Sequence, residues 1–358
     1  MRKIVFTISF LSLFLSSFGQ MSLIKISGAK GSDTGLSYFL PKTMLIVEVE
    51  ATKTTIKAGQ YAKYAEKFLG IKDAPTEDMN LFSMDNITLE TCGEVDKNEG
   101  YMLQYKSSNI PYMYLTQEGV ICSVNMEPDE SYNTVCTPEL PAPKIVQPFS
   151  TNQNALLSEE YLMSGSSLKM AEVAAKQIYR IRESRQDILM GDAENMPKDG
   201  EALKFMLSQL DEKEKALMAM FTGNIQKEKI YYLYKVDIAD APDSQILFRF
   251  SKYMGAVDKN NLSGEPVYLD LKVTDKKELE EPNAKEKKKA EEPGIMYNVP
   301  GKAVATIRVG RKNIVSQEFL FTQLGVKSAL PVILFENKKT TTRVLMDPQT
   351  GGIRQLLQ

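Results

Sequence analysis

Histidine, the side chain most used in acid–base and metal chemistry, is absent from this sequence. A Ser-His-Asp triad, a Cys-His pair and a histidine-based zinc or iron site are therefore excluded, because each needs an imidazole. Acid–base work would fall to carboxylates, lysine or tyrosine. No predicted strand leads into a glycine-rich loop of the kind that binds phosphate. We accordingly expect no cofactor, and we assign no catalytic, cofactor-binding or metal-ligating residue; the binding residues stay unknown.

The three cysteines, Cys92, Cys122 and Cys136, are widely spaced and odd in number. They cannot form a Cys-x-x-Cys metal knuckle, and at most one pair can form a disulfide. We expect buried strand residues, with or without one disulfide. A reactive thiol is the alternative.

Acidic residues offer three patterns to weigh. Asp33-Thr34-Gly35 spells the triplet of aspartic proteases, but that chemistry needs two such carboxylates and the chain has no second copy. The acidic segments 96–100 and 192–195 lack the oxygen spacing of a calcium loop, so we interpret both as turns. Paired carboxylates for glycoside hydrolysis remain open, because they need only lie about 5–10 Å apart in space and leave no mark on sequence spacing.

Two further sets of side chains could form binding surfaces. The tyrosines Tyr101, Tyr105, Tyr112 and Tyr114 could form an aromatic strip, although tyrosine also suits a half-buried strand, which is the interpretation we prefer. Methionines recur in the predicted helices, where we expect them to fill a core rather than to form a recognition groove. They are Met170, Met190, Met206, Met218 and Met220.

The charge balance argues against nucleic acid as a partner. Lysine plus arginine number 44 and aspartate plus glutamate 46, so no basic footprint exists. Residues 275–292 are mostly charged with mixed signs, which predicts a solvated loop. A basic docking patch at residues 285–289 is the alternative. No stretch beyond the N-terminal segment is apolar for long enough to cross a bilayer as a helix.

The N-terminus predicts export. Arg2 and Lys3 precede an apolar stretch at residues 4–15, and Ser17-Phe18-Gly19 forms a small-x-small cleavage site. We therefore expect a signal peptide at residues 1–19 and cleavage before Gln20. Because no cysteine stands at the new N-terminus, we expect a product that is not a lipoprotein.

The elements that must position any site are mainly strands. Period-two patterns predict strands at 44–51, 86–94, 100–106, 112–116 and 119–125, with turns at 96–100 and 117–119. Residues 20–38 resemble a weakly ordered lead-in, and helical spacing at 60–69 predicts a short helix on the sheet. Four prolines at 138–148 predict a linker or an extended edge.

The pattern changes to helical spacing from about residue 167. Two amphipathic helices, separated by a polar turn between Gly191 and Pro197 and ended by Gly223, predict an antiparallel hairpin. Strand patterns then return at 229–237, 245–251, 267–273, 303–309 and 314–321, and 332–336 with 341–346 form a last predicted pair.

We therefore predict an α+β fold with two β-rich domains of antiparallel, sandwich-like sheets and a helical hairpin between them. The predicted boundaries are 20–150 for the N-terminal β-rich domain, 151–225 for the hairpin and 226–358 for the C-terminal β domain with its charged loop at 275–292. The hairpin either packs on one domain or projects toward a partner.

Several strings look familiar together, in one order along the chain. They are Leu40-Pro41-Lys42-Thr43, residues 63–70, residues 177–185, Asn195-Met196-Pro197 with Asp199-Gly200, Phe221-Thr222-Gly223 and residues 347–352. In these strings the chain resembles an uncharacterised family of exported Bacteroidota proteins, domain of unknown function 4831. The resemblance implies a Gram-negative envelope setting, periplasmic or associated with the outer membrane. It implies no reaction, ligand or catalytic residue.

Two classes of function follow as hypotheses. The preferred one is a non-enzymatic cell-envelope protein that binds or scaffolds other envelope proteins or surface glycans. The alternative is a carboxylate-dependent hydrolase acting on glycans. A pocket that holds two acidic side chains, one of them with a raised pKa, would favour the hydrolase. A flat, exposed apolar patch larger than the roughly 300–600 Å² typical of a monomer would favour the scaffold.

Overall fold

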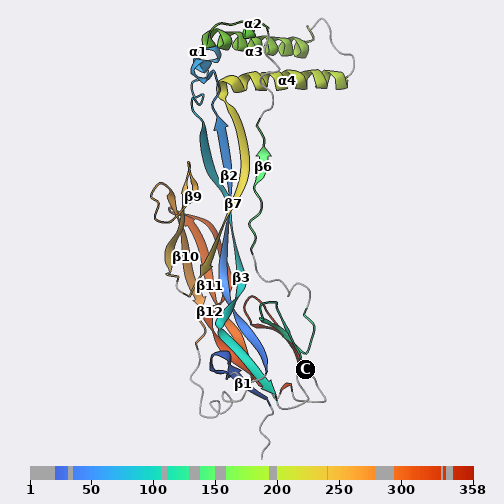
Figure 1. Ribbon diagram of the computed structural model, residues 1–358, viewed down its shortest axis with the longest axis vertical. Coiled ribbons are helices and arrows are strands. Elements are labelled where there is room, and N and C mark those ends of the chain that lie inside the picture. The colour runs from blue at the N-terminus through green and yellow to red at the C-terminus, as the bar shows by residue number, and fades with distance from the viewer. Residues whose placement is uncertain are drawn as a thin grey trace, which may run out of the picture.

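The computed structural model is elongated, with long strands along its axis and two helices across one end (Figure 1). It describes residues 21–30, 35–105, 111–128, 138–149, 159–192, 200–239, 241–278, 294–331, 334–335 and 342–358. The predicted signal peptide lies outside these residues, as does most of the charged segment 275–292.

The longest sheet is antiparallel, in the order β1-β3-β2-β7-β6. Its strands are β1 (Met21–Lys25), β2 (Leu36–Lys57), β3 (Met79–Tyr105), β6 (Lys144–Gln147) and β7 (Asn224–Asp237). The predicted alternation in β2 is confirmed, because Leu45, Val47 and Val49 are fully buried. The proline-rich segment forms β6, an edge strand, which confirms the extended-edge interpretation.

A second antiparallel sheet has the order β12-β11-β10-β8-β9. Its strands are β8 (Ser244–Ser251), β9 (Gly255–Val257), β10 (Glu265–Asp275), β11 (Gly294–Val309) and β12 (Lys312–Pro331). A third sheet has the order β14-β13-β5-β4 and contains β4 (Met113–Leu115), β5 (Ile121–Val124), β13 (Arg343–Met346) and β14 (Ile353–Leu357).

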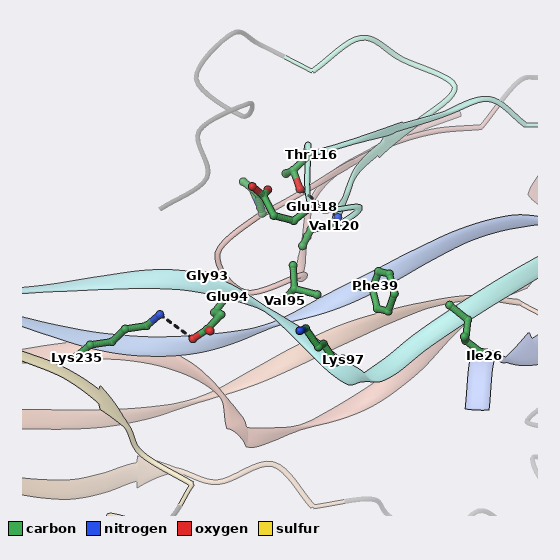
Figure 2. A pocket seen from close by; sticks show the side chains of 11 residues that line it. Ile26, Phe39, Gly93, Glu94, Val95, Lys97, Thr116, Glu118, Val120 and Lys235 are labelled. Carbon is green, nitrogen blue, oxygen red and sulfur yellow. Dashed lines mark hydrogen bonds and ion pairs between the residues drawn. The ribbon is translucent and has the colours of Figure 1, made fainter. Parts of the chain in front are cut away.

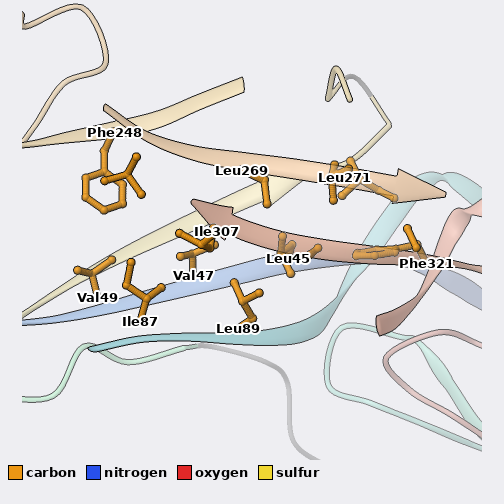
Figure 3. Close-up of a cluster of buried hydrophobic side chains, with 14 residues drawn as sticks. Leu45, Val47, Val49, Ile87, Leu89, Phe248, Leu269, Leu271, Ile307 and Phe321 are labelled. Atoms are coloured by element: carbon orange, nitrogen blue, oxygen red, sulfur yellow. The ribbon is translucent and has the colours of Figure 1, made fainter. Parts of the chain in front are cut away.

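The main core lies between the first two sheets (Figure 3). Leu45 and Val47 of β2 and Ile87 of β3 share one cluster with Leu269 of β10 and Phe321 of β12. The predicted sandwich therefore exists, but it is built from strands of both halves of the chain.

Strand pairing crosses the boundaries predicted at residues 150 and 226. All of β7 pairs with β2, and β13 pairs with β5 in the third sheet. The N- and C-terminal strands thus share sheets and cores, because each sheet needs the other to cover its apolar face. The α+β fold with antiparallel sheets and a helical hairpin is as predicted.

The hairpin consists of α3 (Ser167–Met190) and α4 (Gly200–Thr222). Ser166 caps the start of α3 by accepting a hydrogen bond from the Lys169 backbone, and Gly191 ends the helix with a left-handed conformation. We call α3 and α4 the helical arm. It projects across the end of the long sheet (Figure 1).

The base of the arm packs on a short helical segment, made of a 3-10 turn at Ala62–Tyr64 and α1 (Ala65–Leu69). Tyr61 and Ala65 share a core with Tyr161 of α2 (Glu159–Leu162), with Ile178 of α3 and with Phe221 of α4. The expectation that helix 60–69 covers the sheet is therefore wrong. It lies at the β2–β3 connection, beyond the sandwich, and its apolar residues pack on α2 and on the base of the arm.

The local structure differs from the prediction at three other places. The lead-in contains β1, which pairs along its whole length with β3. The strands predicted at 86–94 and 100–106 form one strand, β3. The strand predicted at 332–336 is not formed at Leu334 and Phe335, and the rest of it lies outside the described residues; β13 pairs with β5 and β14 instead.

Candidate functional site

A groove of about 660 Å³ lies between β3 and the β4–β5 turn. Figure 2 shows its apolar residues, Phe39, Val95 and Val120, near one another, with Glu94 and Lys97 of β3 on one side and Glu118 on the other. Ile26, Gly93, Thr116, Lys235 and Pro348 complete the lining. The volume falls in the range of small-molecule sites, roughly 300–1,000 Å³.

The β4–β5 turn is held against β2 by main-chain contacts. The Phe39 amide donates to the Gly119 carbonyl at 2.9 Å, and Phe39 and Val120 form a parallel bridge. Inside the turn the Thr116 hydroxyl accepts from the Val120 amide at 3.1 Å, and Gly119 has a φ of 84°. The turn predicted at 117–119 is confirmed, and it places Glu118 at the groove.

The opposite wall is a bulge in β3. Gly100 pairs with Phe39 and Val95 pairs with Pro41, so the four residues between them oppose the single residue Leu40. The Asn98 amide donates to the Asp96 carboxylate at 3.0 Å, which closes a local turn. The turn predicted at 96–100 is thus an excursion within a continuous strand. It carries Lys97 into the groove lining.

The end wall comes from the segment 347–352 near the C-terminus. The side-chain amide nitrogen (Nδ2) of Asn298 donates to the main-chain carbonyls of Pro41 and Thr350, at 3.0 and 2.9 Å. These two bonds fasten the segment to β2. Gly93 of β3 lies so close that a Cβ there would sit 2.5 Å from the Pro348 carbonyl. The groove is therefore framed by closely packed backbone at this end.

Of the four charged residues that line the groove, two form an ion pair with each other and two do not. Glu94 and Lys235 form an ion pair at 2.8 Å. Lys97 and Glu118, by contrast, form no ion pair with any residue that the structure describes. Apolar lining with one unpaired charge of each sign suits a ligand that has an apolar body and polar ends. No group of metal-ligating side chains occurs among the described residues.

The free end of the helical arm is the second candidate surface. Leu189 and Met190 at the end of α3 are each 70% exposed, and Phe205 of α4 is 68% exposed. We call these three residues the arm tip. Neither arm helix, nor any other helix in the described parts of the chain, is long and apolar enough to cross a membrane.

The two cysteines that the structure describes, Cys92 and Cys122, are buried strand residues, as expected. Cys92 is fully buried and disulfide-bonded. Cys122 is fully buried too, and its thiol donates to the Val120 carbonyl. Burial raises the pKa of this thiol to about 11, which disfavours the reactive thiolate. Cys136 lies outside the described residues.

The tyrosines that the structure describes fit the preferred interpretation as strand residues better than the alternative of one aromatic strip. Tyr101 is buried against Tyr38 in a core, whereas Tyr112 and Tyr114 form an edge-on pair at β4. The side chain of Tyr105 lies outside the described part. Three of the five methionines, Met170, Met218 and Met220, pack in or on the arm base as core filler. Met206 is partly exposed, and Met190 belongs to the arm tip.

Three sequence patterns cannot be compared with the structure. Asp33 and Thr34 of the protease-like triplet, residues 193–195 of the second acidic segment and the basic run 285–289 all lie outside the described residues.

No residue of the groove could be recognised from the sequence as part of a site. Its lining comes from the 3-10 turn Ile26–Gly28, β2, β3, the β4–β5 turn, β7 and the segment 347–352, so no spacing along the chain connects these residues. The strings that carry the family resemblance could have given a signal. Two of them, 40–43 and 347–352, meet beside the groove, while 63–70, 177–185 and 221–223 meet at the arm base.

Comparison with known proteins supports the resemblance. The family described as domain of unknown function 4831 matches residues 34–354. No curated protein and no solved structure matches the chain. Because the match covers nearly all of the 358 residues, the chain belongs to the family of domain of unknown function 4831.

Proposed function

We propose that the protein is exported to the cell envelope and acts there as a binding or scaffolding protein whose helical arm contacts an envelope or outer-membrane protein. The groove beside the β4–β5 turn serves as a ligand site of the same molecule, for a partner segment or a surface glycan.

The observation that carries this proposal is the arm itself. Its base is anchored in a buried core, while Leu189, Met190 and Phe205 at the free end are mostly exposed. Exposed apolar side chains gathered at the end of a projecting element are typical of protein–protein contacts.

Two features support the envelope setting. The N-terminal pattern predicts a signal peptide, and Cys92 is disulfide-bonded. Disulfides persist mainly in oxidising compartments, including the bacterial periplasm. The proposed location is therefore periplasmic or at the outer membrane.

An affinity pull-down from the native envelope tests the proposal. The test variant replaces Leu189, Met190 and Phe205 with glutamine. The matched control replaces Leu262, which is 81% exposed and lies outside the arm. We expect wild type and the Leu262→Gln control to retain the same outer-membrane protein, identified by mass spectrometry, and the arm-tip variant to lose it. Equal recovery by all three would contradict the role of the arm.

The alternative, a carboxylate-dependent hydrolase acting on glycans, rests on one observation. Glu94 and Glu118 line the same groove from different elements (Figure 2). One feature argues against it: the Glu94 carboxylate is already engaged by the Lys235 ammonium at 2.8 Å, whereas glycoside hydrolysis needs both carboxyl groups directed at the substrate.

A glycan library decides between the two classes. The scaffold proposal predicts no cleavage by wild type, and binding without turnover. Cleavage by wild type that is lost in both Glu94→Gln and Glu118→Gln, with the fold intact by circular dichroism, would establish the hydrolase instead.

A further inference from the structure

The lining of the groove beside the β4–β5 turn is divided between apolar side chains and charged ones. Its apolar part consists of Ile26, Phe39, Val95, Val120 and Pro348. A Cβ at Gly100 would lie 2.6 Å from the Phe39 ring and 2.8 Å from the Ile26 side chain, so both pack directly on the main chain of β3. Both side chains are nevertheless partly exposed. An apolar group of a ligand that covered them would remove apolar surface from water, which stabilises a complex.

Two charged side chains of the groove have no counter-charge among the residues that the structure describes. Lys97 of β3 and Glu118 of the β4–β5 turn are both exposed, and Figure 2 shows Val95 and Val120 between them. Glu94, by contrast, is paired with Lys235. A ligand therefore meets one positive and one negative charge, one on each side of an apolar surface.

Neutral polar side chains, which would bind the hydroxyl groups of a sugar, are scarce in this lining. Among the described residues of the groove, only Thr116 has one, and its hydroxyl already accepts a hydrogen bond from the Val120 amide. A neutral glycan would leave Lys97 and Glu118 without counter-charges, and an acidic glycan would be repelled by Glu118. A peptide can combine apolar side chains with charges of both signs, so the lining favours a peptide.

The size of the groove sets the length of the peptide. In packed sheets an extended chain rises about 3.4 Å per residue, with about 4.8 Å between strands and about 10 Å between sheets, so one residue fills roughly 160 Å³. A groove of about 660 Å³ therefore has room for about four extended residues. Charges on the first and last of these residues would be separated by apolar residues, as Lys97 and Glu118 are separated by the apolar lining.

We propose that the groove binds an extended segment of a partner protein, about four residues long, with a basic residue at one end, apolar residues in the middle and an acidic residue at the other end. The basic residue pairs with Glu118, the acidic residue pairs with Lys97, and the apolar residues pack on Phe39, Val95 and Val120. This inference rests on the proposed function, in which the groove is a ligand site, and it selects the partner segment over the surface glycan.

Methyl NMR with short peptides tests the proposal on the mature chain. The dipolar probe is acetyl-Lys-Leu-Leu-Glu-amide, whose blocked ends leave only the two side-chain charges. Two like-charged probes, acetyl-Lys-Leu-Leu-Lys-amide and acetyl-Glu-Leu-Leu-Glu-amide, keep the apolar middle, and acetyl-Lys-Ser-Ser-Glu-amide keeps only the charges. The labelled methyl groups of Val95 and Val120 report where each probe binds, and titration to about 10 mM gives dissociation constants in the millimolar range.

We expect wild type to bind the dipolar probe at least about threefold more tightly than either like-charged probe, because each of those places one repulsive pair in the groove. The serine probe should bind at least about fivefold more weakly than the dipolar probe, because it buries no apolar side chain.

Charge reversal in the groove should switch this preference. Lys97→Glu should prefer the probe with two lysines, and Glu118→Lys should prefer the probe with two glutamates. The double variant should prefer the dipolar probe again, bound in the opposite orientation. Lys272→Glu on β10 is the matched control, because it changes the charge of an exposed lysine outside the groove. It should keep the wild-type order of affinities.

Three results would overturn the inference. The first is a change of preference in Lys272→Glu equal to that in Lys97→Glu, which would assign the effect to net charge. The second is a shift of the Val95 and Val120 methyl signals by cellotetraose but by none of the peptides, which would leave the groove as the ligand site of the proposed function. The third is the absence of any shift with every probe at about 10 mM. The pull-down with the arm-tip variant tests the proposed function separately, because that variant changes no residue of the groove.

Discussion

The sandwich and the helical arm bury their side chains in very different ways. In the sandwich, strands from both halves of the chain enclose one core, and Phe321 and Leu269 are fully buried. At the outer part of the arm, the two helices pack on each other and on no other element that the structure describes, and the arm tip stays exposed. Stability is therefore concentrated in the sandwich, and surface available for contacts is concentrated in the arm. Four predictions, made on six substitutions, test this comparison.

The largest effect is expected from one phenylalanine in each region. Phe321→Ala opens a cavity in the sandwich core and should reduce the free energy of unfolding by about 3–5 kcal/mol. Phe205→Ala at the arm tip should change it by less than about 0.5 kcal/mol, because the ring is already exposed. Urea denaturation of both variants measures the difference. Similar losses would mean that the arm tip is buried in solution.

Two glycines with the same backbone conformation separate the arm base from its free end. Gly223 and Gly191 have φ angles of 81° and 84°. A Cβ at Gly223 would collide with the Lys57 carbonyl, whereas a Cβ at Gly191 has nothing within 4 Å. We expect Gly191→Ala to cost about 1 kcal/mol, from backbone strain alone, and Gly223→Ala roughly 2–3 kcal/mol. Thermal unfolding compares the two. Equal costs would show that the junction yields easily.

Much of this difference could be predicted from the sequence, because it follows from local pattern. The alternation of Leu45, Val47 and Val49 predicts a buried strand face, and the helical spacing around Ile178 and Leu217 predicts the arm. What could not be predicted is which strands meet. The long pairing of β2 with β7 joins residues that are 167 to 193 positions apart along the chain. No local periodicity encodes such a pairing.

The groove could not be predicted for the same reason. Its position depends on the β3 bulge, where residues that resemble a turn stay within a strand, and on Asn298, which fastens the segment 347–352 to Pro41. Nothing in the period-two pattern around Asn298 distinguishes a buried amide that joins two segments from one that faces water. The exposed arm tip was equally hidden, since Leu189 fits the helical pattern of a core residue.

The third prediction concerns Glu99, a carboxylate in the bulge of β3. Burial alone would raise the pKa of Glu99, but hydrogen bonds from Lys327, Tyr101 and Lys25 outweigh it and lower the pKa to about 2. The stability from these contacts is complete above about pH 4.5 and is lost as the pH falls toward 2.

Glu99→Gln should therefore cost about 1–2 kcal/mol at neutral pH and should flatten the acid limb of the stability curve. Denaturation at a series of pH values checks both effects. An acid limb as steep as that of wild type would assign the pH dependence to other carboxylates. Because Glu99 joins β1, β3 and β12, the loss should appear as global unfolding of the sandwich.

The smallest effect is expected in the arm, where Glu214 of α4 accepts hydrogen bonds from Arg182 and Arg185 of α3. Burial acts to raise the pKa of Glu214, but these two guanidinium groups outweigh it and lower the pKa, so the pairs weaken as the solution becomes acidic. Both arginines are partly exposed, and salt therefore screens the pairs. Glu214→Gln should cost about 0.5–1 kcal/mol of the free energy of unfolding at low salt and less at high salt.

Hydrogen exchange shows which part of the molecule loses stability in this variant. If the outer arm opens as its own unit, amides of α3 and α4 exchange faster while those of β2 and β11 do not change. Faster exchange in both regions would mean that the arm and the sandwich unfold together, and would contradict the division of roles on which the comparison rests.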